Sequence, residues 1–104
     1  MDISVEEIKR RLEPYFQEKS IQKAIVYGSY ARGTATRRSD FDIIIVMNTD
    51  KRFFDRYDLF SDISEHIQGP HVDILIYTPA ELESISHRHF IQSALKDGKI
   101  IYGN

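Results

Sequence analysis

Two aspartates spaced one residue apart lead directly into an apolar run, and this segment most constrains the fold. Asp40 and Asp42 precede Ile43 to Val46. Apolar residues on both faces are typical of a central strand that is covered on both sides. Residues two apart on a strand share a face, so both carboxylates are expected to point to one place. Such like charges repel unless a divalent cation lies between them, and carboxylate oxygens are ligands that Mg²⁺ prefers.

The spacing of apolar and turn-forming residues predicts the elements around this strand. Strands are expected at Ala24–Tyr27, Phe41–Met47, Val72–Tyr77 and Lys99–Tyr102. Helices are expected at Ser4–Lys19, at Lys51–Gln68 and from Pro79 to Lys96, the last with a break around Ser84 to Ser86, and a short helical turn plus loop is expected over Ser29–Ala35. We therefore expect an α/β (α+β) fold, with a small mixed sheet of three main strands packed by helices.

Capping residues and prolines set the expected helix ends. Ser4 and Glu7 have the spacing of a capping box, and Thr78 followed by Pro79 is typical of a helix start. Pro14 lacks an N–H, so the first helix is expected to kink or restart near Glu13. Asp50 is expected to cap the helix that follows it. One side of that helix would carry Phe53, Tyr57, Phe60, Ile63 and Ile67, whereas Phe54 lies outside this stripe.

The bulk composition is that of an ordinary globular chain. The 104 residues suffice for one domain, expected to span 1–104, and the net charge of -2 argues against a polyanionic nucleic acid as substrate. No run approaches the length of a membrane-spanning helix, and the first residues, Met1 to Glu7, lack the basic region of a signal peptide. We expect a soluble, cytoplasmic protein with no membrane partner.

Cysteine and histidine usage bears on metal binding. The absence of cysteine excludes disulfides and thiolate metal sites. The four histidines, His66, His71, His87 and His89, have no spacing that matches a structural zinc site. A zinc site is therefore not expected.

A glycine–serine pair follows the strand that ends at Tyr27. Gly28 would let an anion approach the backbone, Ser29 would add a hydroxyl donor, and Arg32 lies one turn further on. We interpret Gly28, Ser29 and Arg32 as a phosphate-binding turn. Arg37 and Arg38 are interpreted as surface charge. Ser29 is not expected to be a nucleophile, because no histidine lies near it in the motif.

A third acid, Asp73, lies on the strand expected at Val72–Tyr77. Two metal ions about 3.5–4 Å apart can neutralise a triphosphate and align attacking and leaving oxygens, and three carboxylates suffice to hold such a pair. Asp40 and Asp42 would bind the ion on the triphosphate. Asp73 would complete the second site and is a candidate general base. The expected catalytic and metal-binding residues are thus Asp40, Asp42 and Asp73.

These motifs together resemble a known family. Gly28-Ser29-Tyr30-Ala31-Arg32-Gly33, followed by Ser39-Asp40-Phe41-Asp42-Ile43, is similar to the minimal nucleotidyltransferases of the DNA polymerase beta superfamily. The resemblance covers nearly the whole chain. It implies the nucleotidyltransferase fold and nucleotidyl transfer from ATP to a hydroxyl, with Mg²⁺ as the cofactor and release of pyrophosphate.

The same resemblance implies a partner. Short members of this family are commonly paired with a helical HEPN toxin, as the antitoxin that adds AMP to a tyrosine of that partner. At 104 residues the chain leaves no room for the extra helical domain with which relatives such as kanamycin nucleotidyltransferase hold their acceptor. Two alternatives stay open: a non-catalytic antitoxin that neutralises its partner by binding, and a nucleotidyltransferase that acts on a small-molecule hydroxyl.

Overall fold

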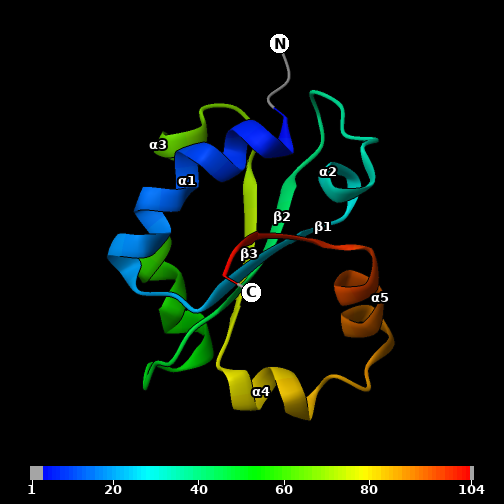
Figure 1. Ribbon diagram of the computed structural model, residues 1–104. Helices are drawn as coiled ribbons and strands as arrows, with labels where there is room; N and C mark the ends of the chain where they lie inside the picture. Colours follow the sequence, from blue (N-terminus) through cyan, green and yellow to red (C-terminus); the bar gives the residue numbers. More distant parts are fainter. Residues whose placement is uncertain (1–3, 104) are drawn as a thin grey trace.

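The computed structural model describes residues 4–103, which fold around one mixed sheet (Figure 1). Within these residues four strands lie in the order β3-β2-β1-β4, where β1 is Lys23–Tyr27, β2 is Phe41–Val46, β3 is Val72–Tyr77 and β4 is Lys99–Tyr102. β1 runs antiparallel to both β2 and β4, whereas β2 and β3 are parallel. β2 is therefore a central strand, as its apolar run predicts.

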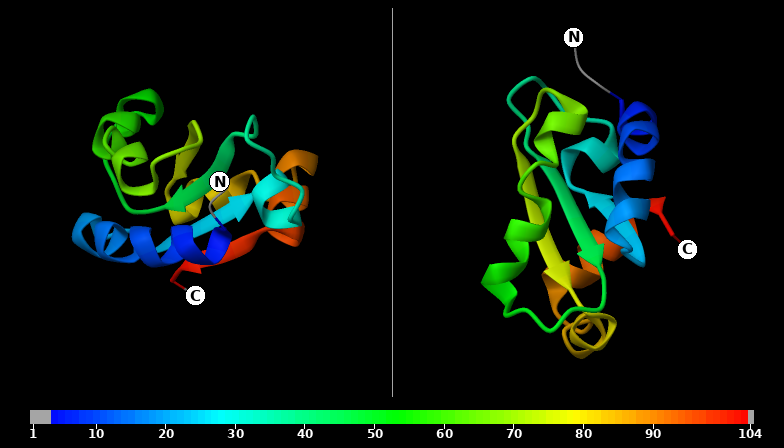
Figure 2. Two further views of the ribbon diagram at one scale, coloured as in Figure 1. Left: turned by 90° about the horizontal axis from the view of Figure 1, so that it is seen from above. Right: turned by 90° about the vertical axis from the view of Figure 1, so that its left-hand side faces the viewer.

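Helices cover both faces of this sheet. They are α1 (Val5–Lys19), α2 (Ser29–Arg32), the 3₁₀ helix η1 (Phe53–Phe60), α3 (Ser64–Ile67), α4 (Pro79–Ser84) and α5 (His89–Asp97). α1 and α3 lie side by side to one side of the strands, and α5 lies on the other side (Figures 1 and 2). The sheet is thus the middle layer of a small α/β sandwich.

The side chains of β2 alternate between two cores, as strand geometry requires. Ile43 and Ile45 belong to a larger cluster with Leu12 and Phe16 of α1. Ile44 and Val46 point to the opposite face and belong to a smaller cluster, which includes Ala94 of α5. The smaller cluster leaves part of its face of the sheet free, and that face carries the candidate site.

The strand predictions are confirmed to within a residue, and so are the helix starts expected at Ser4 and Pro79. The Ser4 hydroxyl accepts a hydrogen bond from the Glu7 N–H at 3.1 Å. Thr78 and Glu81 form a complete capping box at the start of α4. The break expected around Ser84 to Ser86 is found between α4 and α5, over residues 85–88.

The expected restart of the first helix near Glu13 is wrong. α1 runs through Pro14 as one helix. The proline removes one hydrogen-bond donor. However, Leu12 before it and Phe16 after it are both fully buried on the same face. Tertiary packing therefore stabilises the helix on both sides of the proline.

The single helix expected over Lys51–Gln68 is also wrong. The chain forms η1 and then, after a turn, α3, and the residue before η1 is Arg52 rather than a capping Asp50. In a 3₁₀ helix residues three apart are aligned, and the Arg56 guanidinium lies 5.9 Å from the centre of the Phe53 ring. Arg56 is 4% exposed and donates hydrogen bonds to the Ile76 carbonyl and to Glu81. These contacts with β3 and α4 are not visible in the local pattern.

No helix within residues 4–103 is both long enough and apolar enough to cross a membrane. Part of the N-terminal segment considered for a signal peptide, Met1 to Ile3, lies outside the described residues.

Candidate active site

The register of β2 and β3 places the acids of the two strands next to each other. Asp42 pairs directly with Asp73. The Phe41 N–H donates a 2.8 Å hydrogen bond to the His71 carbonyl, which continues the pairing towards the strand starts. Directly paired residues of neighbouring strands share a face, as do residues two apart on one strand. One face of the sheet therefore carries two adjacent rows of side chains. Asp40 and Asp42 form the row along β2, and His71 and Asp73 form the row along β3.

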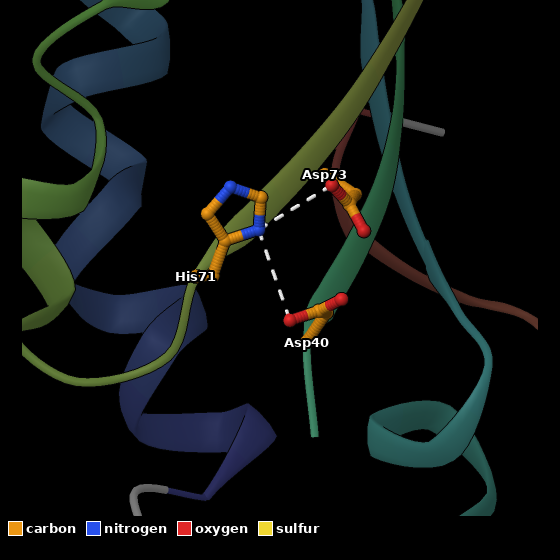
Figure 3. A group of neighbouring side chains, drawn as sticks. All are labelled: Asp40, His71 and Asp73. Atoms are coloured by element: carbon orange, nitrogen blue, oxygen red, sulfur yellow. Dashed lines mark ion pairs between the residues drawn. The ribbon is translucent and has the colours of Figure 1, made fainter. Parts of the chain in front are cut away.

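Three of these side chains converge at the start of the two strands (Figure 3). His71 Nδ1 lies 3.4 Å from Asp73 Oδ1 and 3.7 Å from Asp40 Oδ1. Each residue offers one potential ligand atom, and the three atoms lie within 4.8 Å of one another. About half of each aspartate side chain is exposed, so the cluster is open to solvent.

Asp42 lies where its negative charge is unfavourable. Burial raises the pKa of Asp42, and the nearby carboxylates of Asp73 and Asp40 raise it further, whereas Arg32 opposes the shift. Within residues 4–103 no lysine or arginine forms an ion pair with any of these three aspartates. The only ion-pair partner of Asp40 and Asp73 among these residues is His71, which is charged only when protonated, and the opposing charge near Asp42 is that of Arg32.

This donor set fits a divalent cation. Carboxylate oxygens suit Mg²⁺, and an imidazole nitrogen is a further ligand for divalent metals. The site combines converging donors, excess negative charge and access to solvent. Asp40, His71 and Asp73 lie in ligand reach of one another, whereas Asp42, which lies on the same face of the sheet, is not part of this group.

The predicted phosphate-binding turn lies beside these acids. Gly28 ends β1 and precedes α2, with φ at 74° and ψ at -152°. A β-carbon at Gly28 would lie 2.5 Å from Asp42 Oδ2, so only glycine allows the turn to approach the carboxylate this closely. Ser29 is half-buried, and Arg32 is exposed yet near enough to Asp42 to lower its pKa.

A groove of about 1000 Å³ extends from the site around the edge of β3. Its lining includes Asp42, His71 and Asp73, and on its other side Tyr57 and residues of the η1–α3 segment. Tyr27, which pairs with Asp42 across β1 and β2, also lines it. Burial raises the pKa of Tyr27 to about 12, with further contributions from the Asp42 and Asp73 carboxylates. The Tyr27 phenol therefore keeps its proton at neutral pH.

The structure brings together the acids that the sequence analysis selected, and it adds His71 and Tyr27. Sequence reasoning missed His71 because it was compared only with zinc motifs. The signal was present: His71-Val72-Asp73 has the same two-residue spacing as Asp40-Phe41-Asp42. Arg37 and Arg38 are exposed, as predicted.

The sequence model of the nucleotidyltransferase domain family matches residues 5–102. The chain belongs to this family. The match includes both the Gly28–Ser29 turn and the three aspartates of this nucleotidyltransferase domain.

Two relatives from Methanocaldococcus jannaschii carry names that describe them as candidate protein adenylyltransferases. MJ0435 is 32% identical over 75 residues, which are 72% of this chain and 80% of the relative. MJ1305 is 38% identical over 82 residues, which are 75% of this chain but only 56% of that relative. The similarity thus extends over most of this nucleotidyltransferase domain and over part of the longer relative.

Solved structures share the fold at low sequence identity. A toxin–antitoxin complex with AMP-PNP contains a chain with a TM-score of 0.70 and 21% identity, over 92% of this chain and 73% of that one. The complex of a tri-AMPylated Shewanella oneidensis HEPN toxin with its MNT antitoxin gives a TM-score of 0.59 at 15% identity, over 93% and 71%. These likenesses confirm the predicted nucleotidyltransferase fold.

Proposed function

We propose that this chain is a Mg²⁺-dependent nucleotidyltransferase that transfers AMP from ATP to a hydroxyl of a HEPN toxin, for which it serves as the antitoxin. The observation that carries the proposal is the position of Asp40, Asp42 and Asp73 on one face of the sheet, beside the Gly28 turn. The family match and the two relatives named as candidate protein adenylyltransferases support the same activity.

Each residue has a distinct role in this proposal. Asp40, Asp42 and Asp73 would hold the cation, or two cations, and Mg²⁺ supplies neutralisation of the triphosphate charge when bound. The Gly28 turn and the Ser29 hydroxyl would bind phosphate oxygens, with Arg32 as a further positive charge. Together they would fix the α-phosphate relative to the acceptor hydroxyl.

The proposed reaction is a single displacement of pyrophosphate at the α-phosphorus of ATP. The acceptor oxygen forms a bond with the α-phosphorus of ATP, the bond from that phosphorus to the bridging oxygen breaks, and pyrophosphate leaves with the electron pair. The hydroxyl proton moves to Asp73, which is about half exposed and can pass it to water. Asp73 is thus both a ligand and the candidate base.

The acceptor side of the site favours a macromolecular hydroxyl. The groove is open to solvent and wraps the β3 edge, so a side chain of a second protein can reach the aspartates. The AMPylated HEPN toxin in a structural neighbour suggests a partner of that kind, and a tyrosine hydroxyl is our specific proposal for the acceptor. We further propose that residues 1–104 form one nucleotidyltransferase domain and that it acts in the cytoplasm.

Incubation of the purified chain with its HEPN partner, ATP and Mg²⁺ tests the proposal. The partner should gain the mass of one or more AMP groups, and Asp40→Asn should abolish the gain. Asp50→Asn is the matched control, because Asp50 is exposed and lies outside the groove. Neutralisation of the toxin that persists unchanged in Asp40→Asn would instead establish an antitoxin that acts by binding. Turnover of a small alcohol by the isolated chain would establish the small-molecule alternative.

A further inference from the structure

His71 is held at the candidate site by the backbone rather than by side-chain packing. It lies one residue before β3 and two before Asp73, so its side chain leaves the sheet on the face of the aspartates. The hydrogen bond from the Phe41 N–H to its carbonyl fixes this segment beside Asp40. Because 73% of the side chain is exposed, core packing does not account for its position.

The distances around His71 are slightly longer than those within a metal-ligand set. Adjacent donors of an octahedral ion with bonds of 2.0–2.1 Å lie about 3 Å apart. His71 Nδ1 is 3.4 Å from one carboxylate oxygen and 3.7 Å from another, which belong to different strands. A small closure of these three side chains would place all three donors on one ion. The imidazole would then complete a mixed nitrogen and oxygen set.

The chemical identity of this donor decides which metal the site prefers. Carboxylates and water suit both Mg²⁺ and Mn²⁺, but Mg²⁺ is the harder, oxygen-seeking ion, so an added imidazole nitrogen favours Mn²⁺ of the two. We infer that His71 coordinates the cation held by Asp40 and Asp73, and thereby raises the preference of the site for Mn²⁺ over Mg²⁺. This inference rests on the proposed function, because it takes the cation of nucleotidyl transfer as the ion at this position.

Pulsed electron paramagnetic resonance of Mn²⁺ bound to the whole chain tests the inference directly. Mn²⁺ is added without nucleotide, so that no base nitrogen contributes to the spectrum. The wild type should show modulation from a directly bound imidazole nitrogen, and His71→Ala should lose it. His87→Ala is the matched control, because His87 is exposed in the turn between α4 and α5 and lies away from the aspartates.

Calorimetry measures the preference of the site for Mn²⁺ over Mg²⁺. His71→Ala should weaken Mn²⁺ binding by about tenfold or more, since loss of even an outer group at a metal site has an effect of this size. Mg²⁺ binding should weaken by a smaller factor, so that the ratio of the two affinities falls. Equal losses for both metals would overturn the assigned preference. An unchanged thermal unfolding midpoint is expected for His71→Ala, because the side chain is largely exposed.

The outcomes separate this inference from the proposed function. A wild-type chain that transfers AMP but shows no nitrogen modulation with Mn²⁺, or a His71→Ala variant that keeps the modulation, overturns the role of His71 alone. A chain that binds Mn²⁺ through a nitrogen lost in His71→Ala, yet transfers AMP to no acceptor, overturns the proposed function and leaves His71 a metal ligand.

Discussion

Gly28 lies so close to Asp42 that an added β-carbon would force the Asp42 carboxylate to move. A β-carbon at Gly28 would lie 2.5 Å from Asp42 Oδ2. The backbone of Gly28, with φ at 74° and ψ at -152°, is in a region that other residues rarely adopt. The glycine therefore meets two separate requirements, one of backbone conformation and one of contact with the candidate metal site.

Gly28→Ala should lose both stability and nucleotide binding. We expect the backbone strain to lower the free energy of unfolding by about 1–3 kcal/mol, and the new methyl group to displace the Asp42 carboxylate. Urea denaturation measures the first effect, and calorimetry with AMP-PNP and Mg²⁺ measures the second.

Gly33→Ala is the matched control for this change. Gly33 also has a positive φ, of 77°, but a β-carbon there would meet no atom within 4 Å. It should therefore lose stability through backbone strain while its affinity for AMP-PNP stays close to that of the wild type. Equal losses of affinity in the two variants would contradict a specific contact between Gly28 and Asp42.

The sequence could predict those parts of the site that depend on a pattern within one short segment of the chain. The two-residue spacing of Asp40 and Asp42, the glycine at the end of β1 and the alternation of β2 are local patterns with local physical causes. The fold followed from the same patterns, since each strand has a continuous apolar run between turn residues. Gly28, Asp40 and Asp42 could thus be selected without coordinates.

The rest depends on contacts between distant segments. His71 lies near Asp40 only because β2 and β3 pair in one particular register, and the apolar run of β2, which is buried on both faces, does not by itself fix that register. In the same way, Arg56 can be buried because Glu81 and the Ile76 carbonyl accept its hydrogen bonds. This tertiary contact accompanies a 3₁₀ helix where the local pattern predicted an α-helix. Propensity is a weak guide where such contacts decide.

Asp42→Asn should make the metal-free protein more stable at pH 7. The raised pKa of Asp42 means that its ionised form is less favourable in the folded chain than in the unfolded chain. The amide removes this charge, so the thermal unfolding midpoint should rise. Conversely, Mg²⁺ should raise the midpoint of the wild type by more than that of the variant.

Asp50→Asn controls for the loss of one negative charge, since Asp50 lies outside the groove. It should change neither the metal-free midpoint nor the response to Mg²⁺. An Asp42→Asn protein that unfolds at a lower temperature than the metal-free wild type would show that the carboxylate stabilises the fold, contrary to this prediction.

Glu81→Gln should destabilise the contact between η1 and α4. The Glu81 carboxylate accepts hydrogen bonds of 2.6 and 2.9 Å from the Arg56 guanidinium, which is buried. We expect a loss of about 1–2 kcal/mol in the free energy of unfolding, less than for a fully buried pair because 43% of the Glu81 side chain is exposed. Glutamine keeps an oxygen for the Thr78 N–H, so urea denaturation would report mainly the lost charge. Glu83→Gln, on the exposed side of the same helix, should have little effect.

The same pair predicts how stability depends on pH. The hydrogen bonds from Arg56, followed by that from the Thr78 backbone, lower the pKa of Glu81 from its usual 4.5 to about 2. Since the folded chain holds this proton less tightly than the unfolded chain, the stabilisation is complete above pH 4.5 and is lost as the pH falls towards 2. Unfolding in urea between pH 6 and pH 2 should therefore show a steeper acid decline for the wild type than for Glu81→Gln, with the two curves converging at the acid end. Parallel curves would mean that Glu81 titrates alike in both states, and that the Arg56 contact does not hold its charge in solution.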